Sequence, residues 1–201
     1  MDKREEILLA ALELASQKGL GSVSLGQIAD RVGIKKPSLY NHFSSKEEII
    51  KELYVYLREK AGQQLPPSGE DISALIKERT AYEVLVMSAK RYGAMNSDEK
   101  MMQFYRVIYS QRSLDPTAAQ IVAQETEKMI AATKALFYAL CAHKKLSCKD
   151  IDQAALGFAM SVHSILDYMN DCKSCGKQAD ERLLSDYVKW FCEQIGGQTN
   201  E

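Results

Sequence analysis

Apolar residues recur every three or four positions along most of the chain, the spacing of helices that each bury one face. No segment alternates with a period of two, as a strand with one exposed face would. The pattern predicts an all-α protein of about nine helices and no sheet. The expected helices cover residues 4–18, 24–33, 37–43, 46–61, 71–92, 97–109, 115–140, 147–170 and 180–196.

The stretch from Ser24 to Lys46 carries the clearest signals for helix ends. Ser24 and Gln27 have the spacing of a capping box, and Gly33 suits the left-handed residue that ends a helix. Pro37 suits the first position of a second helix, where its missing N–H is not needed. A further capping box, over residues 45–48, predicts that a third helix begins there.

The helix expected over residues 37–43 is too short to be stable alone, so the rest of the chain must hold it. Leu39 and Phe43 are expected to face inward, which leaves Ser38, Tyr40 and Asn41 exposed. Residues 31–46 contain four cations and no Asp or Glu: Arg31, Lys35, Lys36 and Lys46. This layout favours a DNA-binding helix-turn-helix over a helical hairpin whose charges are merely solvated.

Residues 5–60 resemble the DNA-binding domain of the TetR (tetracycline-repressor-like) family of regulators. The resemblance rests on the amphipathic first helix and on several motif positions: Ser24, Ile28-Ala29, Gly33, the run from Pro37 to Phe43, and Lys46. Within that run, Leu-Tyr-x-His-Phe is the most specific signal. Gly26 departs from the family pattern, because some members carry a base-contacting side chain there.

The resemblance implies a homodimeric, ligand-responsive regulator of transcription, most often a repressor, that inserts residues 37–42 of each subunit into the major groove of a palindromic operator. It makes Lys36, Ser38 and Asn41 candidates for contacts to bases. Tyr40 and His42, with Lys46, become candidates for contacts to phosphates. The full set of expected DNA-binding residues is Ser24, Lys35, Lys36, Pro37, Ser38, Tyr40, Asn41, His42 and Lys46.

The strongest break in the helical pattern is the Gly- and Pro-containing segment 62–69. We predict a helix-turn-helix DNA-binding domain over residues 1–46 and a ligand-binding and dimerisation domain over 47–201. The net charge of the chain is −1, so DNA binding must depend on the local basic run and not on a global positive field. The chain has no apolar stretch near 18 residues and opens without a signal peptide, which predicts a cytoplasmic protein with no membrane association.

Tyrosine and methionine residues gather in the middle helices, where they are suited either to an ordinary core or to a pocket for an apolar ligand. The family resemblance implies an effector cavity there. The expected ligand-binding residues are Tyr82, Met101, Tyr105, Tyr109, Phe137, Met160 and His163. His163 and Asp167, four residues apart, are expected to form a structural pair.

The last two helices carry apolar stripes that predict either a four-helix dimer interface or burial within one chain. The stripe on the first comprises Ala154, Ala155, Phe158, Ala159, Val162, Ile165 and Leu166. The stripe on the second comprises Leu184, Tyr187, Val188, Phe191 and Ile195.

Cys172 and Cys175, expected on a loop over residues 171–179, support an alternative hypothesis of a thiol- or metal-responsive DNA-binding sensor. A structural zinc site needs four ligands, and the sequence shows no second pair with zinc-ligand spacing. The motifs G-x-S-x-G, G-x-x-x-x-G-K-[ST] and H-E-x-x-H do not occur. We therefore predict no enzyme activity and no cofactor.

Overall fold

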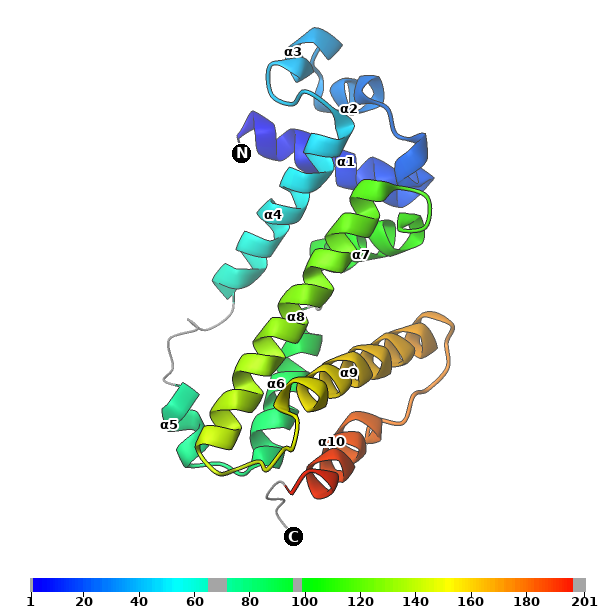
Figure 1. The fold of residues 1–201 in the computed structure, drawn as a ribbon. Helices are drawn as coiled ribbons and strands as arrows, with labels where there is room; N and C mark the ends of the chain where they lie inside the picture. The colour runs from blue at the N-terminus through cyan, green and yellow to red at the C-terminus, as the bar shows by residue number, and fades with distance from the viewer. Residues whose placement is uncertain (1, 65–71, 96–98, 197–201) are drawn as a thin grey trace. The chain divides into compact units, whose positions relative to one another are not determined.

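The computed structural model describes residues 2–64, 72–95 and 99–196, and all regular structure within them is helical (Figure 1). This confirms the predicted all-α fold. None of the described helices is both long and apolar enough to cross a membrane. The helices are α1 Lys3–Lys18, the 3-10 helix η1 Leu20–Ser22, α2 Leu25–Val32, α3 Lys36–Tyr40, α4 Lys46–Gln64, α5 Ile72–Lys77, α6 Ala81–Met95, α7 Glu99–Gln111, α8 Pro116–Ala142, α9 Ile151–Ser174 and α10 Leu183–Gln194.

The described residues form ten α-helices where about nine were predicted, because the helix expected over residues 71–92 is divided into α5 and α6. Thr80 begins α6 with a capping box. Its hydroxyl accepts the Glu83 N–H at 3.2 Å, and the Glu83 carboxylate accepts the Thr80 N–H at 2.8 Å. The apolar spacing continues across this junction, so periodicity alone did not reveal it.

Contacts divide the chain into two compact units, Met1–Pro66 with Asn96–Glu125, and Pro67–Met95 with Thr126–Glu201. The first unit therefore contains α1 to α4, α7 and the start of α8. The second contains α5, α6, the rest of α8, α9 and α10. The functional division after residue 46 stays a prediction, and the expected break at 62–69 lies partly outside the described residues.

In the first unit, α1 packs against α2, α4 and α7 (Figure 1). Its inward face is apolar along its length, with Ile7, Ala11 and Leu12 almost completely buried. The other helices complete one core with fully buried side chains: Ile28, Leu39, Phe43, Ile49, Leu53, Met101, Phe104 and Ile108. Burial of these side chains holds together helices that are too short to be stable alone.

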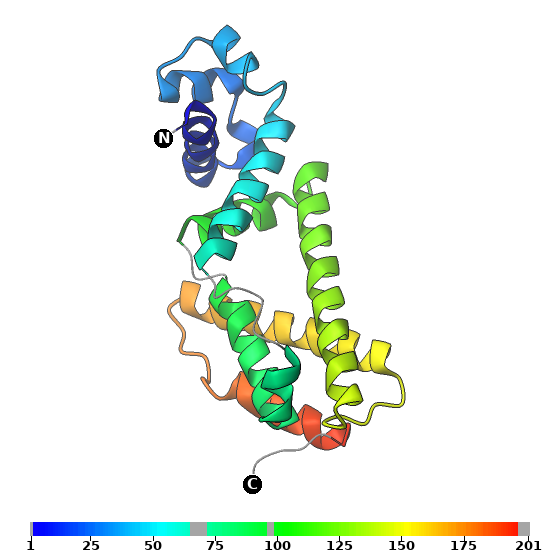
Figure 2. The same ribbon diagram turned by 90° about the vertical axis from the view of Figure 1, so that its left-hand side faces the viewer.

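In the second unit, α10 packs against α6 and α9 (Figure 2). An aromatic cluster joins α8, α9 and α10, because the Phe158 ring lies 5.5 Å from Phe137 and 5.1 Å from Phe191, between ring centroids. Phe158, Val188 and Phe191 are all buried within this single chain. Much of the two stripes predicted for a dimer interface thus forms the core of one subunit instead.

Several predicted helix ends are displaced. The N-cap of α9 is Asp150, whose carboxylate accepts the Gln153 N–H at 3.0 Å, and not Ser147. The same helix extends to Ser174, so Cys172 lies on a helix and not on the expected loop. α10 begins at Leu183, after a turn in which the Asp180 carboxylate accepts the Arg182 N–H at 2.9 Å. The expected cap at residue 97 lies outside the described residues.

Candidate nucleic-acid interface

α2 has the ends that the sequence predicted. The Ser24 hydroxyl accepts the Gln27 N–H at 3.3 Å, and the Gln27 side chain accepts the Ser24 N–H at 2.9 Å. Gly33 is left-handed, with φ 73° and ψ 30°. Its N–H and that of Ile34 donate to the Asp30 and Ala29 carbonyls, which together form a Schellman turn. This closed turn directs the chain sharply into α3.

α3 is shorter than predicted, five residues from Lys36 to Tyr40, with Pro37 at its second position and not its first. Leu39 and Phe43 are buried in the core of the first unit, as expected. The N–H groups of His42 and Phe43 both donate to the Leu39 carbonyl, at 2.9 and 3.0 Å. The two buried side chains therefore anchor the helix and its exit, and leave the opposite face free of packing.

The exposed residues of α3 and its two flanking positions are here termed the α3 surface: Lys35, Lys36, Pro37, Ser38, Tyr40 and Asn41. The Tyr40 side chain is 49% exposed, and the Lys36 ammonium lies 6.0 Å from its ring centroid. An exposed aromatic ring beside cations and hydrogen-bonding groups is suited to a phosphate backbone and base edges. The structure thus brings six of the nine predicted DNA-binding residues onto one surface.

The remaining three predicted residues have partners within the protein. The Ser24 hydroxyl caps α2. His42 is half-buried, and its carbonyl accepts a hydrogen bond from Arg4. The Lys46 ammonium donates to the Leu20 carbonyl at 3.1 Å and is half-buried. The Leu20 carbonyl uses one of the three ammonium N–H groups of Lys46, and the other two can contact a phosphate.

The predicted capping box at the start of α4 forms only in part. The Ser45 hydroxyl accepts the Glu48 N–H at 3.1 Å, as expected. The Glu48 carboxylate, however, accepts from the N–H and hydroxyl of Ser44, each at 2.6 Å. These two bonds hold the pKa of Glu48 below its usual value. The carboxylate therefore fixes the link between α3 and α4 one residue earlier than the motif predicts.

One of the four cations of the basic run is neutralised. Arg31 forms an exposed bidentate pair with Glu13 of α1, whose pKa the pair lowers. With Arg31 paired and Lys46 directed at a carbonyl, the positive charge on the α3 surface comes from Lys35 and Lys36.

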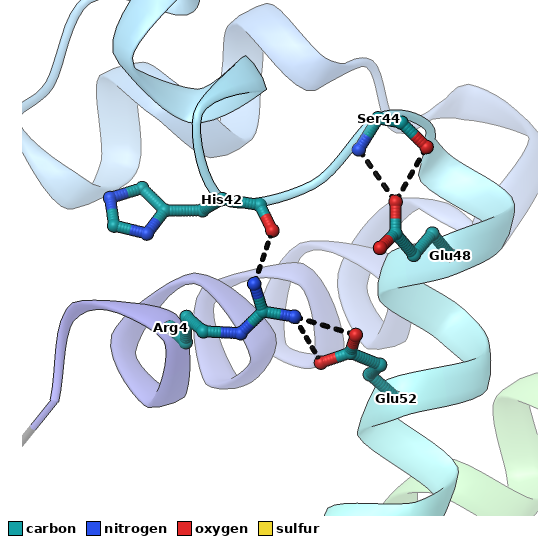
Figure 3. Close-up of polar contacts among 5 residues, drawn as sticks. All are labelled: Arg4, His42, Ser44, Glu48 and Glu52. Carbon is teal, nitrogen blue, oxygen red and sulfur yellow. Dashed lines mark hydrogen bonds and ion pairs between the residues drawn. The ribbon is translucent and has the colours of Figure 1, made fainter.

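Sequence reasoning missed Arg4, at the start of α1 (Figure 3). Its guanidinium donates to the His42 carbonyl at 2.5 Å and to both oxygens of Glu52 at 2.6 Å. It also lies over the Phe43 ring, 4.3 Å from the centroid. Arg4 is 38 residues from His42 and 48 from Glu52, so no local pattern identifies these contacts.

The seven predicted ligand-binding residues are divided between the two units. Met101, Tyr105 and Tyr109 belong to the first, and Tyr82, Phe137, Met160 and His163 to the second. Met101 and Phe137 are completely buried in their respective cores, whereas Met160 is 41% exposed.

Residues of this set make polar contacts in both units. The Tyr105 hydroxyl donates to Glu125 at 2.9 Å. His163 Nε2 lies 3.4 Å from the Asp167 carboxylate, which confirms the predicted pair, and its Nδ1 lies 3.0 Å from the Tyr92 hydroxyl.

A pocket of about 470 Å³ lies elsewhere, between the end of α1 and α7 of the first unit. Its lining is mostly polar and includes none of the predicted ligand-binding residues. The lining residues are Ala15, Ser16, Gly19, Glu99, Gln103, Arg106, Val107 and Ser110.

The five cysteines are free thiols with different environments. Cys172 is buried, and Cys175, at the end of α9, is exposed and donates to the Cys172 carbonyl at 3.4 Å. Burial raises the pKa of both Cys148 and Cys192 to about 11. Within the described residues, no three side chains of His, Cys, Asp or Glu are grouped so as to hold a metal ion.

A capped helix, a Schellman turn and a short second helix with a basic, exposed face define a helix-turn-helix regulator of transcription. Comparison with known families agrees at both ends of the chain. Residues 7–53 match the profile of the bacterial regulatory proteins of the tetR family, and residues 83–191 match the AefR-like transcriptional repressor C-terminal domain. The chain belongs to the TetR family of transcriptional regulators, which are DNA-binding proteins and not enzymes.

Among curated relatives, the HTH-type transcriptional activator FasR of Mycolicibacterium smegmatis is 28% identical over 89% of this chain and 77% of its own length. The HTH-type transcriptional repressor KstR2 of Rhodococcus jostii is 30% identical over 52% of this chain and 48% of its own. Among solved structures, the flavonoid-responsive regulator FrrA has a TM-score of 0.70 at 22% identity, covering 96% of both chains. This last similarity shows the fold alone.

Proposed function

We propose that the protein acts as a homodimer that binds a palindromic DNA operator, represses transcription there, and is released by a small apolar effector. The observation that carries the proposal is the α3 surface, where five polar, basic or aromatic residues and Pro37 are exposed on and beside a helix anchored by buried Leu39 and Phe43. A helix presented in this way can enter a major groove without disturbing its own core.

In this proposal α3 of each subunit enters a major groove, with half-sites about one helical turn apart or somewhat more. Lys36, Ser38 and Asn41 read base edges, and Tyr40 and His42 contact phosphates. Lys46 joins them through the ammonium N–H groups that the Leu20 carbonyl does not use. The positive N-terminal end of α4 adds a further attraction for phosphate.

Exposed apolar side chains on the last two helices support dimerisation. Tyr168 on α9 is 56% exposed, and Trp190 on α10 is 54% exposed. Large apolar side chains of this kind are typical anchors of protein interfaces. We propose that α9 and α10 of two subunits form the four-helix interface through these residues, and not through the buried stripes.

We propose that the effector is apolar and binds within the second unit, among Tyr82, Phe137, Met160 and His163. Aromatic and methionine side chains suit an apolar ligand that is oriented by a few polar groups, which supports this proposal. Because Phe137 is completely buried, a ligand reaching it must displace side chains. Such a ligand binds one conformation better than another and thereby changes the separation of the two DNA-binding heads.

The direction of regulation is part of the proposal. The C-terminal match is to a repressor domain and KstR2 is a repressor, whereas FasR is an activator. Repression predicts that deleting the gene raises transcription from promoters containing the operator, and activation predicts the opposite.

The test is selection of duplexes from a random DNA pool by the wild-type protein, followed by gel-shift assays on the enriched sequence. The expected result is an inverted repeat that is bound cooperatively and released by apolar compounds. Failure to enrich any sequence contradicts the proposed function. Release by zinc or an oxidant, with no response to apolar compounds, favours the alternative sensor that uses Cys172 and Cys175.

A further inference from the structure

We propose that Arg4 is a positioning residue for DNA recognition, which sets the orientation of the α3 surface by holding the backbone of His42. This proposal rests on the proposed function, since it assumes that α3 reads bases. Arg4 is remote in sequence from α3 and lies outside the set of expected DNA contacts.

Three contacts converge on the one guanidinium, and Figure 3 shows those to His42 and Glu52. One terminal nitrogen donates to the His42 carbonyl at 2.5 Å, and the other donates to both Glu52 oxygens at 2.6 Å. The central carbon Cζ lies over the Phe43 ring, 4.3 Å from its centroid. Arg4 thus connects the start of α1, the exit of α3 and the second turn of α4.

α3 needs a constraint at this end because its two ends are held differently. Its N-terminal end follows the closed Schellman turn at Gly33. Its C-terminal end has no such closure, since the chain leaves the helix after Tyr40 and the last bonds converge on the Leu39 carbonyl. Three residues after Leu39, the His42 carbonyl accepts from Arg4. Because Arg4 also binds Glu52, this bond holds the backbone of His42 to α4.

The pair with Glu52 compensates the positive charge of Arg4, and the side chains of both residues remain 40% exposed. Both Glu52 oxygens accept from the guanidinium, which neutralises it and orients its fork toward the His42 carbonyl. A lysine ammonium has no planar fork and cannot make the same three contacts at once. Arg4 therefore acts on DNA through the position of α3, and not as a phosphate contact.

The decisive variant is Glu52→Gln, because two explanations predict opposite signs for it. If only charge mattered, removing an acid from a DNA-binding head would leave affinity unchanged or increase it. If Glu52 holds Arg4, the variant weakens binding to the selected duplex by about tenfold or more, since a displaced helix loses bidentate base contacts. The matched control is Glu59→Gln, the same charge change at an exposed position on the same helix, away from the N-terminal end of α4.

The experiment measures affinity for the duplex enriched by wild type and for an unrelated duplex, with Glu52→Gln, Arg4→Gln, Arg4→Lys, the double variant Arg4→Gln/Glu52→Gln and Glu59→Gln. We expect the first four to lose affinity for the enriched duplex while binding the unrelated duplex as wild type does. We expect Glu59→Gln to retain both affinities. The double variant should bind the enriched duplex as tightly as Arg4→Gln alone does, because Glu52 acts only through Arg4.

Three results would overturn the positioning role. The first is wild-type affinity of Glu52→Gln for the enriched duplex. The second is an equal loss on both duplexes by samples whose circular dichroism shows them folded. The third is a decrease of about one in the salt slope for Arg4→Gln, which marks a lost phosphate contact. If wild type itself enriches no sequence, the proposed function fails, and the positioning role fails with it.

Discussion

Single side chains on the α3 surface differ in what they offer DNA. The ammonium of Lys36 is a mobile point charge on an exposed stem, whereas the amide of Asn41 can pair with an adenine edge through two hydrogen bonds. The two residues lie five positions apart on the same exposed stretch, so they allow the electrostatic and base-reading parts of binding to be separated.

We expect Lys36→Ala to weaken binding to all duplexes and to reduce the salt slope by about one. Asn41→Ala should instead cost about 1–3 kcal/mol on the enriched duplex alone. Gel-shift titrations at several salt concentrations measure both effects. Unchanged affinity in both variants would show that α3 does not contact DNA.

Thiol reactivity provides a second test at the residue scale. Cys175 is exposed, whereas Cys192 is fully buried and burial raises its pKa to about 11. Because the thiolate is the nucleophile, we expect iodoacetamide at pH 7.5 to modify Cys175 first and Cys192 last. Peptide mass spectrometry over time measures the order, and early modification of Cys192 would contradict the packing of α10.

The sign of the pH effect follows from the raised pKa. A thiol whose folded pKa exceeds its unfolded pKa contributes stability that is present below the unfolded pKa and is lost as pH rises through the folded pKa. For Cys192 this window lies between the usual value, near 9, and about 11. Cys192→Ala should therefore lose less stability over that window than wild type does.

At the scale of elements, the left-handed residue that ends α2 sets the direction in which the chain continues to α3. Gly33 adopts φ 73°, a conformation that costs a residue with a side chain about 1 kcal/mol or more. A Cβ at this position would meet no atom within 4 Å, so any cost would come from the backbone and not from a clash.

We expect Gly33→Ala to lower the free energy of unfolding by about 1 kcal/mol. Gly26→Ala in the same helix is the matched control, because its Cβ would make only an ordinary contact, 3.8 Å from the Ser24 hydroxyl. That variant should gain up to about 1 kcal/mol from helix propensity. Chemical denaturation measures both changes, and a loss of equal size in the two would contradict the backbone explanation.

The sequence predicted elements well wherever the signal was local. The capping box at Ser24, the left-handed Gly33 and the inward Leu39 depend on neighbours within five residues, and all three are present. The division between α5 and α6 was missed because the apolar spacing continues through it. Arg4 depends on contacts between separate elements, which residue spacing does not encode. The capping box at Ser45 is partial for a local reason: two serines precede Glu48, and the spacing does not decide which of them its carboxylate binds.

At the scale of the whole molecule, the proposed dimer interface does not coincide with the apolar stripe predicted for α10. Val188, on that stripe, is fully buried within its own chain, whereas Trp190, two residues further along α10 and outside the stripe, is 54% exposed. Spacing alone left open whether the stripe is buried within one chain or in a dimer interface. Only packing against α6 and α9 separates residues that stabilise one subunit from residues available to a second.

We expect Trp190→Asp to leave the subunit folded but to weaken dimerisation by about 2 kcal/mol or more, because it places a charge where an apolar anchor is needed. The control Lys189→Asp introduces the same acid at an exposed position on another face of α10 and should retain the dimer. Sedimentation velocity at micromolar concentration measures both. A monomeric wild type, or a dimeric Trp190→Asp, would place the interface elsewhere or exclude it.

In and beside α3, the residues that anchor the helix are different from the residues that are exposed. This separation affects how the DNA sequence recognised by such a regulator can change during evolution. Leu39 and Phe43 hold the helix, while Lys35, Ser38 and Asn41 are exposed and outside the buried core. Exchanging exposed residues typically changes stability by less than about 0.5 kcal/mol. A duplicated gene can therefore change its binding site by a few substitutions in α3 without compensating mutations in the core. Descendants of such a duplication would share one fold while recognising unrelated promoters.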